Sequence, residues 1–436
     1  MKSLLFRSVS LALVCASFAA AQPADDTKLR QVIIFSRHSV RAPVAPNDYL
    51  NGFSVRKYPL FTVAPGILTD NGIKLETLVG GYFRQWLTKE GLLTGKDTVD
   101  AGFTYVRANI LERTRTTAQS FASGLLPGAS ITVNWQQQGS DPLFDPVGAG
   151  VAVLDQRKAI AAVVGRLGGN PQSLAAVYAP ELSSTRALLL NYPAGQTPAP
   201  PTPAGLTDVT AIPIAVTAGS PGSPVTIEGL TPVGLAVDPF IMQYADGMPA
   251  AEVGWGQLNA DGVAQSLRLY SLSMDLEYRT PYISALGASN VASHIVRSLV
   301  QSATGNSMTG TLGTPSTKVI LLVASDVNLA AFSSLLEINW LIPGYPLNYP
   351  SPGGALVFEL RQSMSSGEYI IRTSYRAQTL DQLRNKTVLS LTTPLGIAPV
   401  FIPGCSSKTA TFDCALADFV KMSKRAIDLK SADTVN

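Results

Sequence analysis

Residues 32–43 read VIIFSRHSVRAP, and this stretch decides the fold. Its first four residues form a short run rich in β-branched side chains, which is typical of a buried strand in a parallel sheet. Arg37, His38 and Arg41 follow directly after that run. In open α/β sheets, ligands bind beyond the carboxyl ends of the strands. The stretch therefore predicts a parallel strand with a charged site at its end.

A second strand-to-helix junction lies nearer the other end of the chain. Residues 318–324 are the strongest buried-strand signal, and residues 325–328 (SDVN) follow them and begin a helix. Because strands and helices alternate at both ends of the chain, the predicted fold is α/β, with a mostly parallel central sheet flanked by helices. Periodicity also predicts helices near 70–90, 112–123 and 281–303, and strands near 103–107, 131–133, 355–361 and 368–374.

The middle of the chain has a different character. Residues 145–270 are mostly helical by periodicity, and a Pro/Gly/Ala/Thr-rich stretch at 192–225 predicts a solvated loop or loose hairpin. We interpret 145–270 as an inserted, mainly helical cap subdomain. Residues 22–144 and 271–436 then form the two parts of the α/β domain.

The first residues are typical of a secretory signal peptide. A positively charged start and an apolar run precede an A-x-A site at 19–21, so we expect the mature chain to begin at Gln22. The apolar run is too short for a membrane span. A lipoprotein anchor at Cys15 is the disfavoured alternative, because the bulky Val14 precedes it. We therefore expect a periplasmic or secreted protein without a membrane anchor.

Composition excludes several classes of function. The 436 residues are 46% hydrophobic, enough for a large core. The signal holds two basic residues and no acidic ones, so its loss leaves 31 basic residues against 30 acidic ones, and nothing predicts binding to nucleic acid. Cys405 and Cys414 favour one disulfide in an exported chain, with two free thiols as the alternative. With only His38 and His294 in the chain, a zinc site is poorly supported.

The residues after the first strand suit phosphoryl transfer. The guanidinium groups of Arg37 and Arg41 can bind phosphate oxygens in bidentate fashion. A neutral His38 imidazole could attack phosphorus, and a phosphohistidine would divide hydrolysis into two easier steps. Because R-H-x-x-R is a short pattern, a chance match or a structural salt-bridge cluster is the alternative reading of these residues alone.

Residues 36–43 resemble the R-H-G-x-R-x-P signature of histidine acid phosphatases, with Ser39 in the glycine position. The chain is similar over nearly its whole mature length to the branch that holds bacterial periplasmic phytases and glucose-1-phosphatases. Further matching segments are LTxxG at 68–72, ERTR at 112–115, DPLFDP at 141–146, DGMP at 246–249, GWG at 254–256, RTP at 279–281, PGG at 352–354, VFE at 357–359 and the pair Cys405 and Cys414.

This resemblance implies roles for individual residues. His38 is the expected nucleophile, and Asp326 the acid that protonates the leaving alcohol. Arg37, Arg41 and Arg113 are expected to bind the phosphate of a small phosphate monoester. The general-acid role implies an acidic pH optimum, the family needs no metal or organic cofactor, and we expect a monomer. Without the resemblance, Asp326 is an ordinary helix N-cap.

The chain departs from the family pattern at the second junction. The family has His-Asp there, whereas this chain has Ser325-Asp326. Ser325 can donate one hydrogen bond to a phosphate oxygen but supplies no cationic donor, and such a loss typically lowers the rate about 100–1000-fold. We expect slow turnover, with a degenerate member that binds phosphorylated ligands without efficient turnover as the alternative. His294 lies mid-helix and is not expected to compensate.

The predicted substrate range follows from the cations around the site. Val44-Ala45 stand where phytases of this kind have Thr-Lys, and the lysine helps to hold inositol phosphates. Residues 233–256 also resemble the glucose-1-phosphatase type. Arg279 is expected to offer one more anion contact. A pocket with few cations favours singly phosphorylated sugars over phytate.

Overall fold

The computed structural model describes residues 25–220 and 222–433, so the predicted signal peptide at 1–21 lies outside the described residues. Within them, an eight-stranded sheet has the order β10-β8-β7-β1-β6-β2-β3, with β9 paired to β8. Its strands are β1 (Thr27–Arg37), β2 (Thr104–Ala108), β3 (Val133–Asn134), β6 (Val319–Ala324), β7 (Ala355–Ser363), β8 (Tyr369–Ala377), β9 (Gly396–Pro399) and β10 (Cys414–Ala415).

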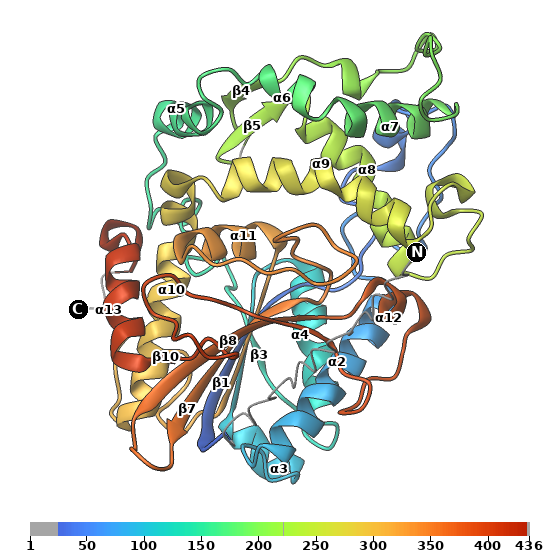
Figure 1. Cartoon of the computed structure of the whole chain (residues 1–436). Helices are drawn as coiled ribbons and strands as arrows, with labels where there is room; N and C mark the ends of the chain where they lie inside the picture. Colours follow the sequence, from blue (N-terminus) through green and yellow to red (C-terminus); the bar gives the residue numbers. More distant parts are fainter. Residues whose placement is uncertain (1–24, 221, 434–436) are drawn as a thin grey trace, which may run out of the picture.

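Helices cover both faces of this sheet, and a further group lies beyond one end of it (Figure 1). The α-helices are α1 (Asn47–Leu50), α2 (Asp70–Lys89), α3 (Asp97–Asp100), α4 (Glu112–Leu125), α5 (Gln156–Arg166), α6 (Ser173–Val177), α7 (Ala179–Leu190), α8 (Thr231–Ala245), α9 (Ala260–Tyr278), α10 (Pro281–Thr304), α11 (Asp326–Leu335), α12 (Leu380–Asn385) and α13 (Leu416–Ala426).

The sheet is mixed in its pairing. β1, β6, β2 and β3 pair in parallel, whereas β7 pairs antiparallel with both β1 and β8. β8 therefore runs in the direction of β1, and most strands share that direction. The predicted α/β fold is confirmed. The prediction placed the third strand at 131–133, whereas β3 begins two residues later, at Val133, and ends at Asn134.

The apolar run at 32–35, in the second half of β1, contributes to two cores, one on each face of the sheet. Ile33 and Phe35 belong to the core that includes residues of α10, α11 and α13, while Val32 and Ile34 belong to the core under α2 and α4. Alternation follows from the period of two along a strand. All six residues of β6, which pairs with β1, are also buried. A strand between two helical layers needs such a continuous apolar run.

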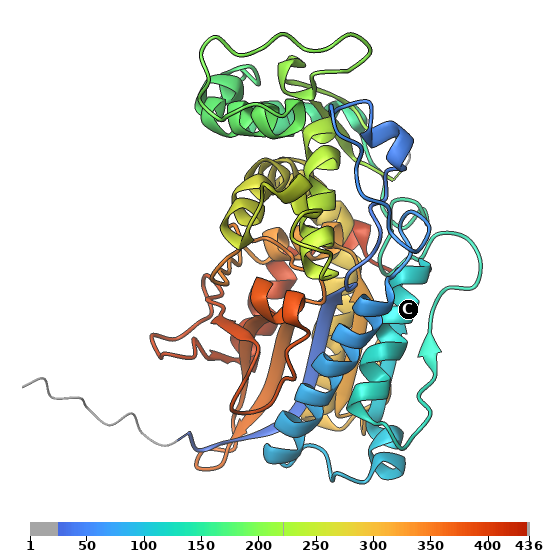
Figure 2. The same cartoon turned by 90° about the vertical axis from the view of Figure 1, so that its right-hand side faces the viewer.

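A third core lies beyond the end of the sheet, among α5 to α9 (Figure 2). It contains a β-hairpin, β4 (Ala215–Ala218) and β5 (Val225–Glu228), which partly overlaps the stretch predicted as a loop or loose hairpin. Leu50, Phe53 and Tyr58 also belong to this core, and the Tyr58 hydroxyl donates to Ala236 O at 2.8 Å. α9 runs without interruption across residue 270, the predicted end of the cap.

The described C-terminal region is tied down by a disulfide between Cys405 and Cys414, as expected. Cys414 also starts β10, which pairs with β8. Among residues 25–220 and 222–433, no helix combines the length and apolar character needed to cross a bilayer. The same residues contain no cluster of three or more potential metal ligands.

Candidate active site

His38 lies at the carboxyl end of β1, where backbone hydrogen bonds fix it on two sides. Its N–H donates to Ala324 O at 2.9 Å, and its carbonyl accepts from Gly353 N at 3.1 Å. The ring is buried, with Nδ1 2.8 Å from Ser39 O. Since a carbonyl oxygen only accepts, Nδ1 carries the proton and Nε2 keeps a free lone pair. Burial, and then the charges of Arg37, Arg41 and Arg113, hold the pKa of His38 well below its ordinary value, so the ring is neutral.

Three arginines surround this imidazole. Arg37 and Arg41 lie within three residues of His38 in the sequence, and the charges of both, together with that of Arg113, lower the pKa of its ring. In each, Nε is buried and has no hydrogen-bond partner among the described residues. Buried donors are nearly always paired in folded proteins, so several unpaired ones around one point indicate a site for an anionic ligand.

Two of the three guanidinium groups are held in place by other contacts. Arg37 Nη1 donates to Pro350 O at 2.6 Å, and its Nη2 lies 2.9 Å from Asp326 Oδ2. Arg41 donates from both terminal nitrogens to the carboxylate of Asp238, at 2.9 and 3.3 Å. These bonds leave the Nε edges of both arginines unpaired, and they fix the planes of the groups in advance of a ligand.

Asp326 is the first residue of α11 and faces the same cluster. Its Oδ2 accepts a hydrogen bond from the Tyr270 hydroxyl at 2.8 Å. Burial raises its pKa, but the charges of Arg37 and Arg41 together with the hydrogen bond from Tyr270 outweigh burial, so the pKa lies below its ordinary value. The carboxyl group is thus ionised when the site holds no phosphate.

The other two predicted site residues are engaged elsewhere. Ser325 Oγ donates to Asn328 Oδ1 at 2.8 Å, which joins the first turn of α11 and directs the hydroxyl proton away from a ligand. Arg279 donates to Asp275 at 3.2 Å and to Asn339 at 2.9 Å. It lines a neighbouring cavity of about 700 Å³, with Tyr349 and Pro350 in the shared wall. The structure therefore brings together His38, Arg37, Arg41, Arg113 and Asp326, but leaves Arg279 outside that cluster.

Comparisons with known proteins identify the family of the chain. The family model described as the histidine phosphatase superfamily (branch 2) matches residues 28–189. Phytase AppA of Escherichia coli (strain K12) is 33% identical over 437 residues, covering 98% of this chain and 98% of that protein. The chain belongs to branch 2 of the histidine phosphatase superfamily.

A second relative agrees in length, and a solved structure agrees in fold. Glucose-1-phosphatase of Providencia rettgeri is 28% identical over 436 residues, covering 97% of this chain and 99% of that protein. The solved structure of Hafnia alvei phytase in complex with myo-inositol hexakis sulphate matches with a TM-score of 0.82 and 28% identity, and covers 94% of this chain and 100% of that one. The similarity thus spans both the sheet and the helical part.

Three side chains of the cluster were not predicted from the sequence: Asp238, Tyr270 and Tyr349. Asp238 could have been predicted from the sequence, because it is the one acidic residue in the apolar run of α8 and so indicates a buried ion pair. Tyr270 and Tyr349 could not have been predicted as site residues, because an aromatic core residue is equally expected at each of these positions. In this branch 2 member they form one wall of the site, with their ring centroids 6.0 Å apart.

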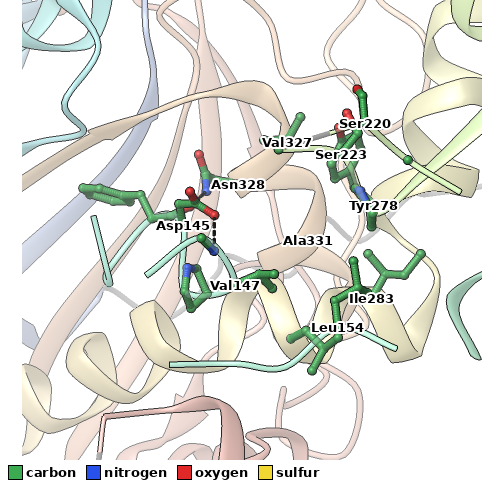
Figure 3. Close-up of a pocket in the computed structure, with 18 of the residues that line it drawn as sticks. Asp145, Val147, Leu154, Ser220, Ser223, Tyr278, Ile283, Val327, Asn328 and Ala331 are labelled. Atoms are coloured by element: carbon green, nitrogen blue, oxygen red, sulfur yellow. Dashed lines mark hydrogen bonds between the residues drawn. The ribbon is translucent and has the colours of Figure 1, made fainter. Parts of the chain in front are cut away.

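A separate cavity of about 400 Å³ lies beside α11 (Figure 3). Its lining includes Val327 and Asn328 but none of the arginines, His38 or Asp326. Figure 3 shows Leu154 and Ile283 on its apolar side. Because the unpaired donors lie elsewhere, we do not assign the phosphoryl chemistry to this cavity.

Asp238→Asn is expected to destabilise the protein, because it leaves the buried charge of Arg41 without its partner. The free energy of unfolding should fall by about 3 kcal/mol, measured by urea denaturation. The freed guanidinium group is also available to anions, so inorganic phosphate should raise the Tm of the variant more than that of the wild type.

Glu181→Gln is the matched control for this substitution, since it removes the partner of Arg268, whose side chain is 61% exposed. It should cost less than about 1 kcal/mol. Equal stability of Asp238→Asn and wild type, with equal response to phosphate, would show that the Arg41–Asp238 pair does not hold the site.

Proposed function

We propose that this chain is an exported acid phosphatase that hydrolyses phosphate monoesters through a phosphohistidine on His38. The observation that supports it most strongly is the neutral, buried His38 ring, with Nε2 free, inside a cluster of three arginines that keep unpaired N–H groups. The relatives named above are phosphatases, and hydrolysis of phosphate monoesters is the chemistry that this cluster suits.

The reaction has two steps. In the first, Nε2 of His38 attacks phosphorus, the ester P–O bond breaks, and Asp326 gives a proton to the leaving alcohol. In the second, Asp326 takes a proton from a water molecule, which attacks phosphorus and breaks the P–N bond. The guanidinium groups of Arg37, Arg41 and Arg113 offset the charge on the phosphoryl oxygens in both steps.

The proton used by Asp326 must come from the substrate. In the free protein, burial favours the neutral carboxyl group, but Arg37 and its neighbours prevail and lower the pKa of Asp326. A phosphate monoester with one remaining proton can deliver it, because its bound negative charge offsets the arginines and lets the carboxyl group accept it. The reactive substrate is then the monoanion.

We therefore expect kcat/KM to fall as pH rises through about 6, the second pKa of a phosphate monoester. Two aryl phosphates with different second pKa values provide the measurement, because the pH at which kcat/KM falls should move with the substrate. A fall at the same pH for both substrates would assign it to a protein group. On the acid side, activity should persist below pH 6.5, because the pKa of His38 is lowered by burial and by the arginines.

Substitution of Ser325 distinguishes a slow phosphatase from a degenerate protein that binds phosphorylated ligands without turnover. Its hydroxyl proton goes to Asn328, so it adds no donor to the phosphate site. Ser325→His should restore a cationic donor and raise kcat about 10- to 100-fold, measured with glucose 1-phosphate at acid pH. Loss of the bond to Asn328 should cost about 1 kcal/mol of stability. An unchanged kcat with intact phosphate binding would favour the degenerate reading.

We further propose that singly phosphorylated sugars are preferred over phytate. Asp238 offsets the charge of Arg41, and Arg279 is engaged by Asp275, so few free cations surround the site. Val44 is exposed where related phytases carry threonine next to a lysine. Phosphate release from glucose 1-phosphate and phytate, compared from pH 3 to pH 7, tests this. A strong phytate preference would overturn the substrate proposal, and release from neither would overturn the hydrolase proposal.

Export completes the proposal. The sequence of the first 21 residues and the disulfide between Cys405 and Cys414 both suit an oxidising compartment, either the periplasm or the medium. Within this proposal the region formed by 145–270 acts as a cap over the site, contributing Asp238 and, at its border, Tyr270. We propose that the protein acts there as a monomer.

A further inference from the structure

Ser39 occupies a position from which it controls the imidazole of His38. Its carbonyl accepts the hydrogen bond from Nδ1 of His38, at 2.8 Å, and its N–H donates to Thr117 Oγ1 at 3.0 Å. The signature of the family has glycine here, so this chain adds a hydroxyl group next to the nucleophile. That hydroxyl group is buried and makes no hydrogen bond of good geometry among the described residues. Burying it unpaired costs stability.

Glu76 of α2 is the buried polar group that faces this hydroxyl. Its side chain is 1% exposed, and neither carboxyl oxygen makes a hydrogen bond of good geometry within the described part of the chain. A β-carbon placed on Gly353 would lie 2.7 Å from Glu76 Oε2 and 3.7 Å from Ser39 Oγ, so both oxygens border the same small space. Gly353 is also the residue whose N–H holds the His38 carbonyl.

The Glu76 carboxyl group is neutral in this environment. Burial raises its pKa well above the ordinary value, and the hydroxyl group of Ser39 is the one polar side chain that acts against burial. A neutral carboxyl group has both a donor and an acceptor. It can therefore satisfy the serine hydroxyl group without bringing a negative charge near the phosphate.

We propose that Glu76 is a positioning residue, which pairs with Ser39 and so fixes the carbonyl group that orients the His38 ring for attack. The inference rests on the proposed function, since it assigns Glu76 a part in that reaction. The hydroxyl group of a serine in the glycine position requires a buried hydrogen-bond partner, and the carboxyl group of Glu76 in α2 is that partner. Without the partner, the buried hydroxyl group would seek another acceptor, and the Ser39 carbonyl group would move with it.

A double-mutant cycle tests the pairing. Glu76→Leu should lower kcat about tenfold with little change in KM, the equivalent of about 1.4 kcal/mol, because the ring is misoriented while the arginines remain. In the Ser39→Gly background, the same substitution should change kcat less than about twofold, since no hydroxyl group needs a partner. Glu76→Gln keeps a neutral donor and acceptor, and should retain most of the wild-type kcat. If Glu76→Leu lowered kcat equally with Ser39 and with Ser39→Gly, Glu76 would be only a packing residue and the proposal would be overturned.

A second measurement does not depend on turnover. The chain has only two histidines, so ¹⁵N-histidine labelling of the His294→Gln background leaves the His38 ring as the sole signal. With the wild-type residues at 39 and 76, the ring should be the neutral tautomer with the proton on Nδ1. Glu76→Leu should give a mixture of tautomers, and adding Ser39→Gly to it should restore the Nδ1-protonated form.

If Glu76→Leu fails to fold, Glu76→Met, whose side chain is close to glutamate in size, replaces it in both backgrounds. Glu76→Met should give a mixture of tautomers when Ser39 is present and the Nδ1-protonated form alone with Ser39→Gly. An unaltered tautomer in Glu76→Leu and in Glu76→Met would overturn the inference even in an active enzyme. If the wild type releases no phosphate yet the tautomer responds as expected, the hydrolase proposal fails and the pairing of Glu76 with Ser39 stands.

Discussion

His38→Ala is expected to abolish phosphate release, with kcat falling by about 10⁴-fold or more. The loss follows because the other side chains of the cluster are arginines, the arginine-paired carboxylates of Asp238 and Asp326, and tyrosine hydroxyls, none of which replaces the imidazole. Phosphate release from glucose 1-phosphate at acid pH is the measurement. Inorganic phosphate should still stabilise the variant, because all three arginines remain.

His294→Ala is the matched control. His294 lies in α10, with Nε2 3.5 Å from Asp433 Oδ2, and it takes no part in the cluster. Its replacement should leave kcat within about twofold of the wild type, as expected for a residue remote from the reaction. Acid-labile phosphate trapped on the wild-type chain during turnover, and absent from His38→Ala, would identify the intermediate. Comparable losses in both histidine variants would contradict the assignment of the nucleophile.

Asp326→Asn is the second substitution with a large expected effect, and its size should depend on the leaving group. An alkyl phosphate needs a proton on the departing oxygen, so formation of the phosphohistidine in a single turnover should slow about 10²- to 10⁴-fold. With p-nitrophenyl phosphate, whose leaving group departs unprotonated, this first step should slow less than about tenfold, measured as the burst of p-nitrophenol. The two substrates are compared at one acid pH with the same preparation.

The variant also changes the charge around Arg37. Without the carboxylate 2.9 Å from its Nη2, that guanidinium group is free to bind anions more strongly. Inorganic phosphate should therefore inhibit Asp326→Asn at lower concentration than it inhibits the wild type. An equal slowing of the first step with both leaving groups would mean that Asp326 positions Arg37 and does not transfer a proton to the leaving group.

Local sequence patterns predicted the elements that form the centre of the sheet. The β-branched run at 32–35 and residues 319–324 are buried on both faces, so their composition alone identifies them as strands. β9 and β10, with four and two residues, were missed, because such short edge strands are set by the neighbours they pair with. The hairpin β4–β5 was anticipated only as a loose one, since its proline-rich flank masks the strand pattern.

The site was predictable to the extent that its residues belong to a contiguous motif or to a resembling family. Arg37, His38 and Arg41 follow one strand, so their proximity is dictated locally. Asp238 and Tyr270 reach the cluster from other helices, and only tertiary packing brings them there. The hydrogen bond from Arg279 to Asp275 could not be predicted either, because a family resemblance indicates a residue's position in the sequence and not its contacts.

The third core has a consequence for engineering. Leu50, Phe53 and Tyr58 belong to it, although they precede the helical region by about a hundred positions along the chain. A chimera that exchanges only 145–270 with a relative would place foreign side chains against these three anchors. Transplanting a new specificity into this scaffold should therefore carry residues 47–58 along with the helices, so that both halves of the interface come from one parent.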